Sequence, residues 1–318
     1  MKHIILFLNL VLSLSLFAQK SKLPFKDRTF RAPTGQGKLF GTLSTPKEGN
    51  KDIICVIVPG SGPTDRNGNS GVFVYSNSYK ILADSLAIRG FAVLRYDKRG
   101  VGESKYVYNS ETEMTFDLYT KDVNFIINQI KKEKDFKKIV LIGHSEGSLL
   151  SIKAALNDSI AGLISLCGVG RSADSLLLTQ LSNLPTDLKE EAIQIVQKIN
   201  AGQTVENVSK PLMSIFRPSV QPYLRTWFKI NPAFEFSKLE IPTLVIQGGT
   251  DLQVEIREGQ ILSAANPKAE YKFIADMNHI LKRATSDRTQ NIKTYGEPEL
   301  ELHPELVPAI VDFLNRLP

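Results

Sequence analysis

Residues 138–150 read Lys138-Ile-Val-Leu-Ile-Gly-His-Ser-Glu-Gly-Ser-Leu-Leu150, an apolar run that passes through a glycine-flanked serine into a second apolar stretch. The turn Gly143-His-Ser-Glu-Gly147 has the form Gly-x-Ser-x-Gly. Between a strand and a helix, this turn presents its serine at the carboxyl end of a sheet. The glycines are required because side chains there would collide as strand and helix fold back on each other. The stretch therefore predicts a strand, a sharp turn with Ser145 as nucleophile, and a helix.

Apolar runs alternate with helix-length segments on both sides of this turn. Near-continuous apolar strands are typical of a sheet that is covered on both faces, and the alternation indicates a mostly parallel α/β sheet. The strands are expected at residues 53–58, 91–96, 139–142, 160–166, 243–246 and 271–274, and the helices at 77–88, 115–133, 146–157, 255–265 and 305–316. Partial alternation on either side of residues 34–37 predicts an antiparallel hairpin at one edge of the sheet.

Residues 170–236 form a connection too long for an ordinary crossover, and a structureless loop of that length is improbable in a compact domain. The segment shows helical periodicity, so we expect a helical cap inserted into a core made of residues 19–169 and 237–318. Trp227 and Phe228 lie late in this segment. They either shape an acyl pocket or pack the cap onto the core.

A serine nucleophile needs a base, and four histidines can be considered. His3 belongs to a removable leader, His144 is adjacent to the nucleophile where the turn directs its side chain elsewhere, and His303 is expected near the start of the last helix. His279 directly follows the last predicted strand. We therefore expect His279 to be the base.

The acid of such a triad is expected between the serine and the histidine in chain order. Asp251 ends the stretch Thr243-Leu-Val-Ile-Gln-Gly-Gly-Thr-Asp251, in which a strand and a glycine turn deliver a carboxylate to the edge that holds Ser145. Glu255 and Asp276 are the rivals. The position directly after the strand favours Asp251.

Two backbone amides are needed to hold the oxyanion of the transition state. One is the amide of the residue after the nucleophile, Glu146. The second is expected in the loop Pro59-Gly-Ser-Gly-Pro63. Pro63 has no N–H, so Ser61 is the candidate, with Gly62 as the alternative.

Residues 1–18 have the pattern of a secretory signal peptide, with Lys2 before an apolar run and the small Ala18 before polar residues. We expect cleavage near Ala18 and an exported protein, periplasmic or extracellular. No later apolar stretch is long enough to span a bilayer, so no stable membrane anchor is expected after cleavage. The oligomeric state stays open.

The formal charge of +6 comes from lysines and arginines scattered among acids, and no nucleic-acid motif is present. The two cysteines, Cys55 and Cys167, lie in apolar runs and are expected to be buried free thiols. No His or Cys cluster has metal spacing, and Gly100-Val-Gly102 lacks the third glycine of a dinucleotide fingerprint. We expect neither a metal nor a cofactor, and no nucleic-acid partner.

Five motifs together resemble the bacterial α/β-hydrolase esterases of the serine-aminopeptidase-like (S33-type) family. They are Pro59-Gly-Ser-Gly-Pro-Thr-Asp-Arg-Asn-Gly68, Tyr96-Asp-Lys-Arg-Gly-Val-Gly-Glu-Ser104, Gly143-His-Ser-Glu-Gly147, Gly248-Gly-Thr-Asp251 and Met277-Asn-His279. The resemblance implies an eight-stranded α/β-hydrolase core with a helical cap, and places the triad on Ser145, Asp251 and His279. The chain lacks the His-Gly-Gly-Gly of hormone-sensitive-lipase relatives, and its nucleophile is not the cysteine of dienelactone hydrolases.

These observations predict a serine hydrolase that cleaves small-molecule carboxylic esters of small to medium acyl groups by two-step acyl transfer. An aminopeptidase or amidase is the alternative, which would need an acidic site for a free amino terminus; Glu190, Glu191 and Glu206 are candidates in the cap segment. A noncatalytic binding protein on the same scaffold is a further alternative.

Overall fold

The computed structural model describes residues 23–50, 52–71, 74–107 and 110–318. The predicted signal peptide, residues 1–18, lies outside the described residues. Within them, eight strands form one sheet in the order β1-β2-β4-β3-β5-β6-β7-β8. The strands are β1 (Phe25–Thr34), β2 (Gly37–Pro46), β3 (Ile53–Val58), β4 (Ala92–Tyr96), β5 (Lys138–His144), β6 (Gly162–Leu166), β7 (Thr243–Gly248) and β8 (Glu270–Ile274).

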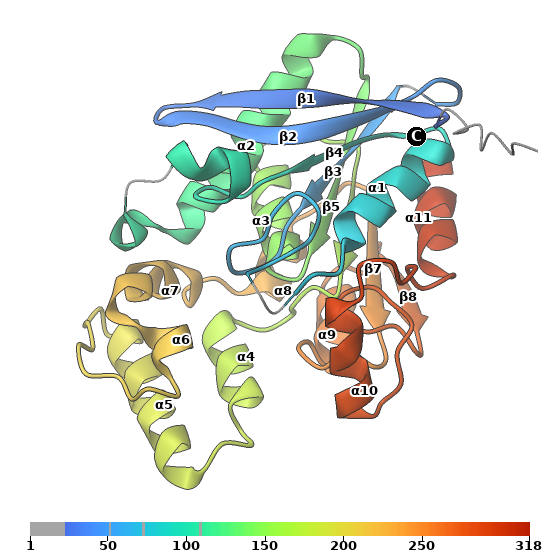
Figure 1. Cartoon of the computed structure of the whole chain (residues 1–318). Helices are drawn as coiled ribbons and strands as arrows, with labels where there is room; N and C mark the ends of the chain where they lie inside the picture. The colour runs from blue at the N-terminus through green and yellow to red at the C-terminus, as the bar shows by residue number, and fades with distance from the viewer. Residues whose placement is uncertain (1–22, 51, 72–73, 108–109) are drawn as a thin grey trace, which may run out of the picture.

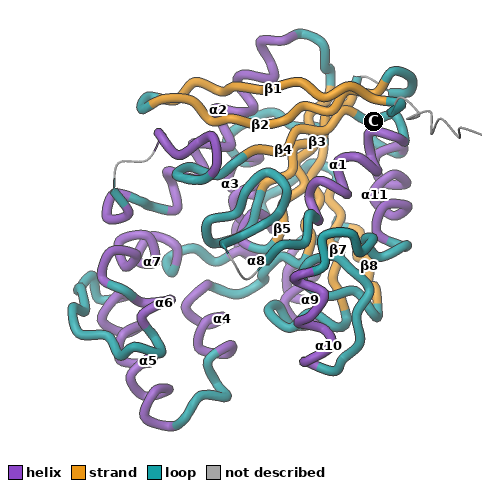
Figure 2. Tube along the Cα trace, in the orientation of Figure 1, coloured by secondary structure: helices purple, strands orange, loops and turns teal. Residues whose placement is uncertain are grey.

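The predicted edge hairpin is confirmed, since β1 pairs antiparallel with β2, and β2 continues antiparallel onto β4. From β4 to β8 all neighbouring strands are parallel. Every residue of β3, β4, β6 and β7 is buried, which is why these strands are mostly apolar in sequence. Figure 2 shows the parallel strands running through the middle of the molecule, with the β1–β2 hairpin at the top.

Two helical layers cover the faces of the sheet. One apolar cluster joins the strands to α1 (Ser78–Ile88) and α11 (Leu306–Asn315). On the other face, the strands pack against α2 (Phe116–Glu133), α3 (Glu146–Ala155) and α9 (Ile256–Ala265). Figure 1 shows α1 and α11 on one side of the sheet and α2 and α3 on the other. The predicted α/β-hydrolase architecture, a mostly parallel sheet flanked by helices, is therefore confirmed.

The segment 170–236, predicted as a helical cap, is helical between β6 and β7. It contains α4 (Ala173–Gln180), α5 (Thr186–Asn200), α6 (Met213–Phe216), the short 3-10 helix η3 (Pro218–Val220), α7 (Gln221–Trp227) and α8 (Pro232–Phe236). In Figure 1, α4 to α7 lie together at the lower left. Helix α8 packs on α3 and α9, so its contacts are with the helices that cover the sheet.

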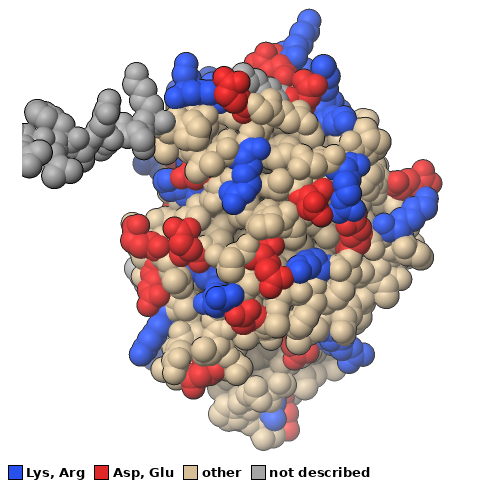
Figure 3. All heavy atoms as spheres, turned by 90° about the vertical axis from the view of Figure 1, so that its right-hand side faces the viewer, with Lys and Arg blue, Asp and Glu red and all other residues tan. Residues whose placement is uncertain are grey.

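The remaining described elements are short. They are the 3-10 helices η1 (Gly102–Val107), η2 (Glu111–Glu113) and η4 (Thr294–Gly296), and α10 (Arg288–Lys293). None of the described helices is long and apolar enough to cross a membrane. On the face shown in Figure 3, basic and acidic side chains are interspersed, and exposed ion pairs such as Lys272–Glu305 (2.6 Å) illustrate this mixing.

Candidate active site

Ser145 occupies a strained turn between β5 and α3. Its backbone has φ 55° and ψ −122°, a conformation that costs a residue other than glycine about 1–3 kcal/mol. A Cβ on Gly143 would lie 2.4 Å from the carbonyl oxygen of Gly147, and a Cβ on Gly147 would lie 2.1 Å from that of Val58. The glycines of the motif are therefore required by backbone contacts, as the sequence predicts for this turn.

Asp251 and His279 meet beyond the ends of β7 and β8. One carboxylate oxygen, Oδ2, lies 2.8 Å from His279 Nδ1. The other, Oδ1, accepts the backbone N–H groups of Gln253 and Val254, both at 2.8 Å. Burial alone would raise the pKa of Asp251, but His279 and these two amides more than offset it, so the pKa lies below the ordinary carboxyl value. Asp251 therefore stays ionised and accepts the hydrogen bond from Nδ1 of His279, and this contact does not use Nε2.

The structure separates Asp251 from the rival Asp276. Asp276 accepts a hydrogen bond from the buried His303 at Nε2 (2.7 Å) and pairs with Arg283 (2.8 Å). His303 precedes α11 and is occupied by this contact. His279, by contrast, contacts the buried carboxylate of Asp251 and lines the same cavity as Ser145.

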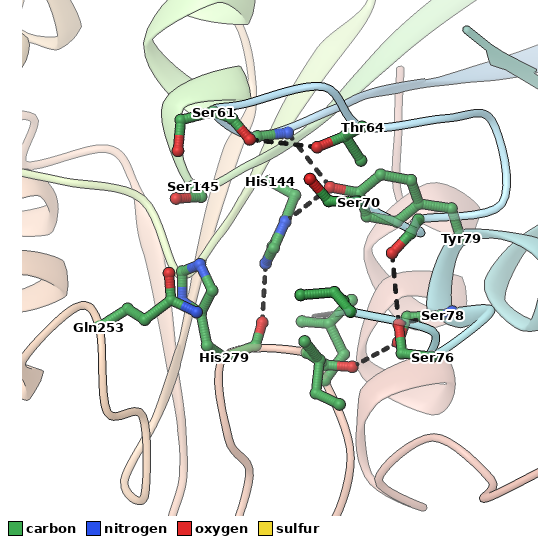
Figure 4. Close-up of a pocket in the computed structure, with 15 residues that line it drawn as sticks. Ser61, Thr64, Ser70, Ser76, Ser78, Tyr79, His144, Ser145, Gln253 and His279 are labelled. Carbon is green, nitrogen blue, oxygen red and sulfur yellow. Dashed lines mark hydrogen bonds between the residues drawn. The ribbon is translucent and has the colours of Figure 1, made fainter. Parts of the chain in front are cut away.

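His144 has a role that its position in the motif does not suggest. Its Nδ1 lies 2.7 Å from the hydroxyl of Tyr79, and its Nε2 lies 2.7 Å from the backbone oxygen of His279. That carbonyl can only accept, so Nε2 carries the proton and Nδ1 accepts from Tyr79. The Tyr79 hydroxyl in turn accepts the N–H of Gly60 at 3.1 Å. A chain of hydrogen bonds therefore joins the loop after β3 to the backbone of His279, as Figure 4 shows.

The His144 imidazole is kept neutral, first by its burial and then by the neighbouring His279. The centroids of the two rings are 4.7 Å apart. Burial and His279 together lower the pKa of His144 from the ordinary 6.5 to about 3. A neutral ring is what the chain requires, because protonated Nδ1 could no longer accept from Tyr79. Sequence reasoning dismissed His144 because it adjoins Ser145. The partners that define it, Tyr79 and His279, come from distant parts of the chain.

The predicted oxyanion donors lie beside the nucleophile. Glu146 is the first residue of α3, so its amide has no carbonyl one turn earlier in the helix to bond. Ser61 follows β3, and Ser61 and Ser145 line the same cavity (Figure 4). The loop that contains Gly60 lies close to Ser145. A Cβ on Gly60 would be only 3.2 Å from the Ser145 Cβ, so glycine permits this approach.

Cys167 lies behind the triad, at the end of β6. Its Sγ, an oxygen of Asp251 and a ring nitrogen of His279 lie within 4.8 Å of one another. Burial and then the Asp251 charge raise the pKa of the thiol well above its ordinary value, so the thiol keeps its proton. These three residues are a geometrically plausible ligand group, and Nδ1 of His279 and Oδ2 of Asp251 are engaged in the hydrogen bond to each other.

Two cavities at the site are larger than a third, of about 10 Å³, that Ser145 and Glu146 also line. The first, of about 190 Å³, contains Ser145, His144 and His279, and hydroxyl side chains form much of its wall. The second, of about 490 Å³, lies between the loop after β4 and helices α6 and α7. Apolar and aromatic side chains line it together with five charged ones, which are Lys98, Arg99, Glu111, Glu146 and Arg217. Ser61 lines both. The cavities therefore meet at the oxyanion loop.

The structure distinguishes the two aromatic residues proposed for the acyl pocket. Trp227 lines the second cavity and stacks on Phe116, 6.1 Å between ring centroids. Phe228 is 4% exposed and belongs to the hydrophobic core, outside the described lining of that cavity. Trp227 therefore lines a cavity, whereas Phe228 packs in the core.

Comparison with known proteins gives concordant results. The family model described as serine aminopeptidase, S33, matches residues 69–283. Esterase EstD of Thermotoga maritima is 24% identical over 257 residues, which cover 76% of this chain and 58% of that protein. A 2-hydroxy-6-oxononadienedioate/2-hydroxy-6-oxononatrienedioate hydrolase of a Pseudomonas species is 23% identical over 270 residues, 77% of this chain and 87% of that one.

Among solved structures, Est1E of Butyrivibrio proteoclasticus with bound ferulic acid superposes with a TM-score of 0.61 at 19% identity. The superposition covers 90% of this chain and all of that one. At this identity the likeness shows the fold alone.

Proposed function

Because the chain belongs to the serine aminopeptidase S33 family, we propose that it is a serine hydrolase that cleaves carboxylic esters of small molecules. The observation that carries the proposal is the contact between His279 Nδ1 and Asp251 (2.8 Å) beside Ser145 in its strained turn. The esterase names of similar proteins support it. The chain spans 58% of the length of the Thermotoga esterase, so the activity of that protein enters here only as support.

The proposed mechanism is acyl transfer in two steps. Nε2 of His279 takes the proton of Ser145 as Oγ attacks the ester carbonyl, and the amides of Ser61 and Glu146 hold the oxyanion. His279 then gives this proton to the departing alcohol, leaving an acyl-enzyme on Ser145. A water molecule, deprotonated by His279, releases the carboxylic acid and restores the serine.

The position of His279 assigns the two cavities. Because the base must protonate the leaving alcohol, that alcohol lies in the cavity lined by His279, which is the smaller of the two and has several hydroxyl side chains in its wall. The acyl group then extends into the cavity of about 490 Å³. This volume is within the usual range of ligand pockets and supports acyl groups of small to medium size. Trp227, which lines the cavity, would contact the acyl group.

The family name raises the alternative of an aminopeptidase, which would bind a free ammonium group close to Ser145. The carboxylates that line the two cavities, among the described residues, are Glu111 and Glu146. Glu111 already pairs with Arg217 (2.8 Å from Nε) and Glu146 with Lys98 (3.1 Å). Glu190, Glu191 and Glu206 do not line either cavity. The paired charges favour a neutral acyl group.

The test uses residues 19–318, the wild type and Ser145→Ala, on p-nitrophenyl esters from acetate to palmitate and on aminoacyl p-nitroanilides. We expect rapid hydrolysis of the shorter esters, abolished by Ser145→Ala, and slower hydrolysis of the anilides. Faster cleavage of the anilides would replace the esterase proposal by the aminopeptidase. No turnover of either class, together with no labelling by a fluorophosphonate, would favour a noncatalytic binding protein.

We further propose that the protein is exported, periplasmic or extracellular, after cleavage near Ala18. The signal-like pattern of residues 1–18 supports this. Amino-terminal sequencing of the protein recovered outside the cytoplasm should begin near Gln19. An unprocessed chain that starts at Met1 and stays in the cytoplasm would refute the proposal.

A further inference from the structure

The motif Asp97-Lys98-Arg99 follows β4 and enters the site region with three charged side chains. Asp97 pairs with Arg66 (2.6 Å), and Arg99 donates from Nε to Asp122 at 2.9 Å. These two pairs brace loops. Lys98 is different because its side chain points to the wall of the larger cavity while only 3% of the residue is exposed.

The Lys98 ammonium has partners in three directions. Nζ donates to the backbone oxygen of Gly60 at 2.9 Å and to Oε1 of Glu146 at 3.1 Å. It also lies 4.4 Å from the centroid of the Tyr119 ring. A buried ammonium costs several kcal/mol of desolvation, and an apolar side chain is often as stabilising at such a position. Fold stability alone therefore does not explain a lysine here.

The first contact fixes one oxyanion donor. The oxygen of Gly60 and the N–H of Ser61 belong to the same peptide unit, and the structure contains no cis peptide bond among the described residues. In a trans peptide the C=O and N–H point in opposite directions. By holding the Gly60 oxygen, Lys98 therefore sets the direction in which the Ser61 N–H points. A cation on the carbonyl also polarises the amide, which strengthens its N–H as a donor.

The second contact reaches the other donor. Glu146 is the residue whose amide completes the oxyanion hole, and its side chain is 2% exposed, so it is held beneath the turn rather than in solvent. Its carboxylate is tied to the same ammonium as the Gly60–Ser61 peptide. The two donors are 85 positions apart in sequence. Lys98 is the group that joins them.

We infer that Lys98 is a positioning residue that holds both amides of the oxyanion hole in register with Ser145. This inference deepens the proposed function and rests on it, since an oxyanion hole matters only if Ser145 forms a tetrahedral intermediate. Lys98 acts through the two backbone amides and does not touch the reacting atoms.

The experiment compares wild type with Lys98→Met, which keeps the aliphatic stem and removes the ammonium. The readouts are kcat and KM on the best p-nitrophenyl ester, the rate constant for labelling of Ser145 by a fluorophosphonate, and Tm. Because loss of a direct oxyanion donor lowers kcat about 10²- to 10³-fold, loss of its positioning residue should lower kcat and the labelling rate about 10- to 100-fold. KM should change less than about threefold, because the ground-state ester does not use the hole fully.

Lys282→Met is the matched control. Lys282 is also buried, and its Nζ donates to a backbone oxygen, that of Glu297, away from the oxyanion loop. We expect it to lower Tm while kcat and the labelling rate stay within about threefold of wild type. Lys98→Arg, which keeps the charge, should recover part of the lost rate.

If Lys98→Met folds poorly because Glu146 is left unpaired, Lys98→Met combined with Glu146→Gln removes both buried charges and should show the same fall in kcat. Labelling of Lys98→Met at the wild-type rate would overturn the inference and leave the ester hydrolase intact. Equal losses in Lys98→Met and Lys282→Met would also overturn it, because the effect would then be general disorder. Ester turnover by wild type, abolished by Ser145→Ala, tests the proposed function separately.

Discussion

Replacing His144 with glutamine is expected to flatten the acid dependence of this protein's stability. Glutamine can still hydrogen bond, but it cannot titrate. In the wild type, burial and the neighbouring His279 hold the pKa of His144 at about 3 in the folded state, against an ordinary 6.5. Between about pH 3 and about pH 6.5, His144 is therefore protonated in the unfolded chain and neutral in the folded chain.

The sign and size of the effect follow from this difference. Because the unfolded state binds more protons, the His144 contribution to stability is complete above about pH 6.5 and is lost as the pH falls toward about pH 3. Each pH unit within that window costs about 1.4 kcal/mol. Between about pH 6.5 and about pH 4.5 the wild type should lose about 2 kcal/mol of unfolding free energy more than His144→Gln loses. His144 is 7% exposed, so solvent screening reduces this figure little.

Urea unfolding at a series of pH values measures the difference, followed by the fluorescence of the single tryptophan, Trp227, and by circular dichroism. Tyr79→Phe is the control, since it removes the hydroxyl that donates to His144 Nδ1 but leaves the imidazole able to titrate. That variant should be less stable at every pH and keep most of the wild-type slope. Parallel curves for wild type and His144→Gln would refute the reasoning, because His144 would then titrate alike in both states.

Three further predictions concern the triad, the acyl cavity and the strained turn. Asp251→Asn should keep the fold and lower kcat by about 10⁴-fold, because the amide favours the wrong tautomer of His279; steady-state kinetics with Tm as the fold control decides this. Trp227→Ala should raise kcat/KM for longer acyl chains relative to acetate. Phe228→Ala should lower the unfolding free energy by about 3–5 kcal/mol and leave the chain-length preference unchanged. A changed chain-length preference in Phe228→Ala would contradict the assignment of the acyl group to the cavity lined by Trp227. Ser145→Gly should be inactive and have a higher Tm than Ser145→Ala, because only glycine adopts the φ of this turn without strain; equal Tm values would show that the turn stores no strain.

Much of the architecture could be predicted because it depends on local patterns. The strand Ile53–Val58 appears with the predicted bounds, and the helices after Ser145 and before the carboxyl terminus differ from prediction by two residues or fewer at each end. Runs of apolar residues set the strands, and the parallel order brings their carboxyl ends to one edge. Ser145, Asp251 and His279 follow from this rule, since each comes after the end of a strand.

Trp227 and Phe228 show why side-chain surroundings could not be predicted in the same way. They are adjacent in sequence and similar in chemistry, yet one lines a cavity and the other is packed into the core. Successive residues of a helix point about 100° apart, so only the position of α7 against α2 decides which ring meets the cavity.

The sequence by itself determined the order of strands and helices along the chain and pointed to a candidate nucleophile and its partners, because periodicity and turn chemistry act over a few neighbouring residues. Only the tertiary structure decided which groups brace that site. His144 meets Tyr79 and the backbone of His279, and Lys98 meets Gly60 and Glu146, across separations of 38 to 135 residues. Such contacts arise because the sheet brings loops from distant parts of the chain together at one edge, and no local sequence pattern predicts them.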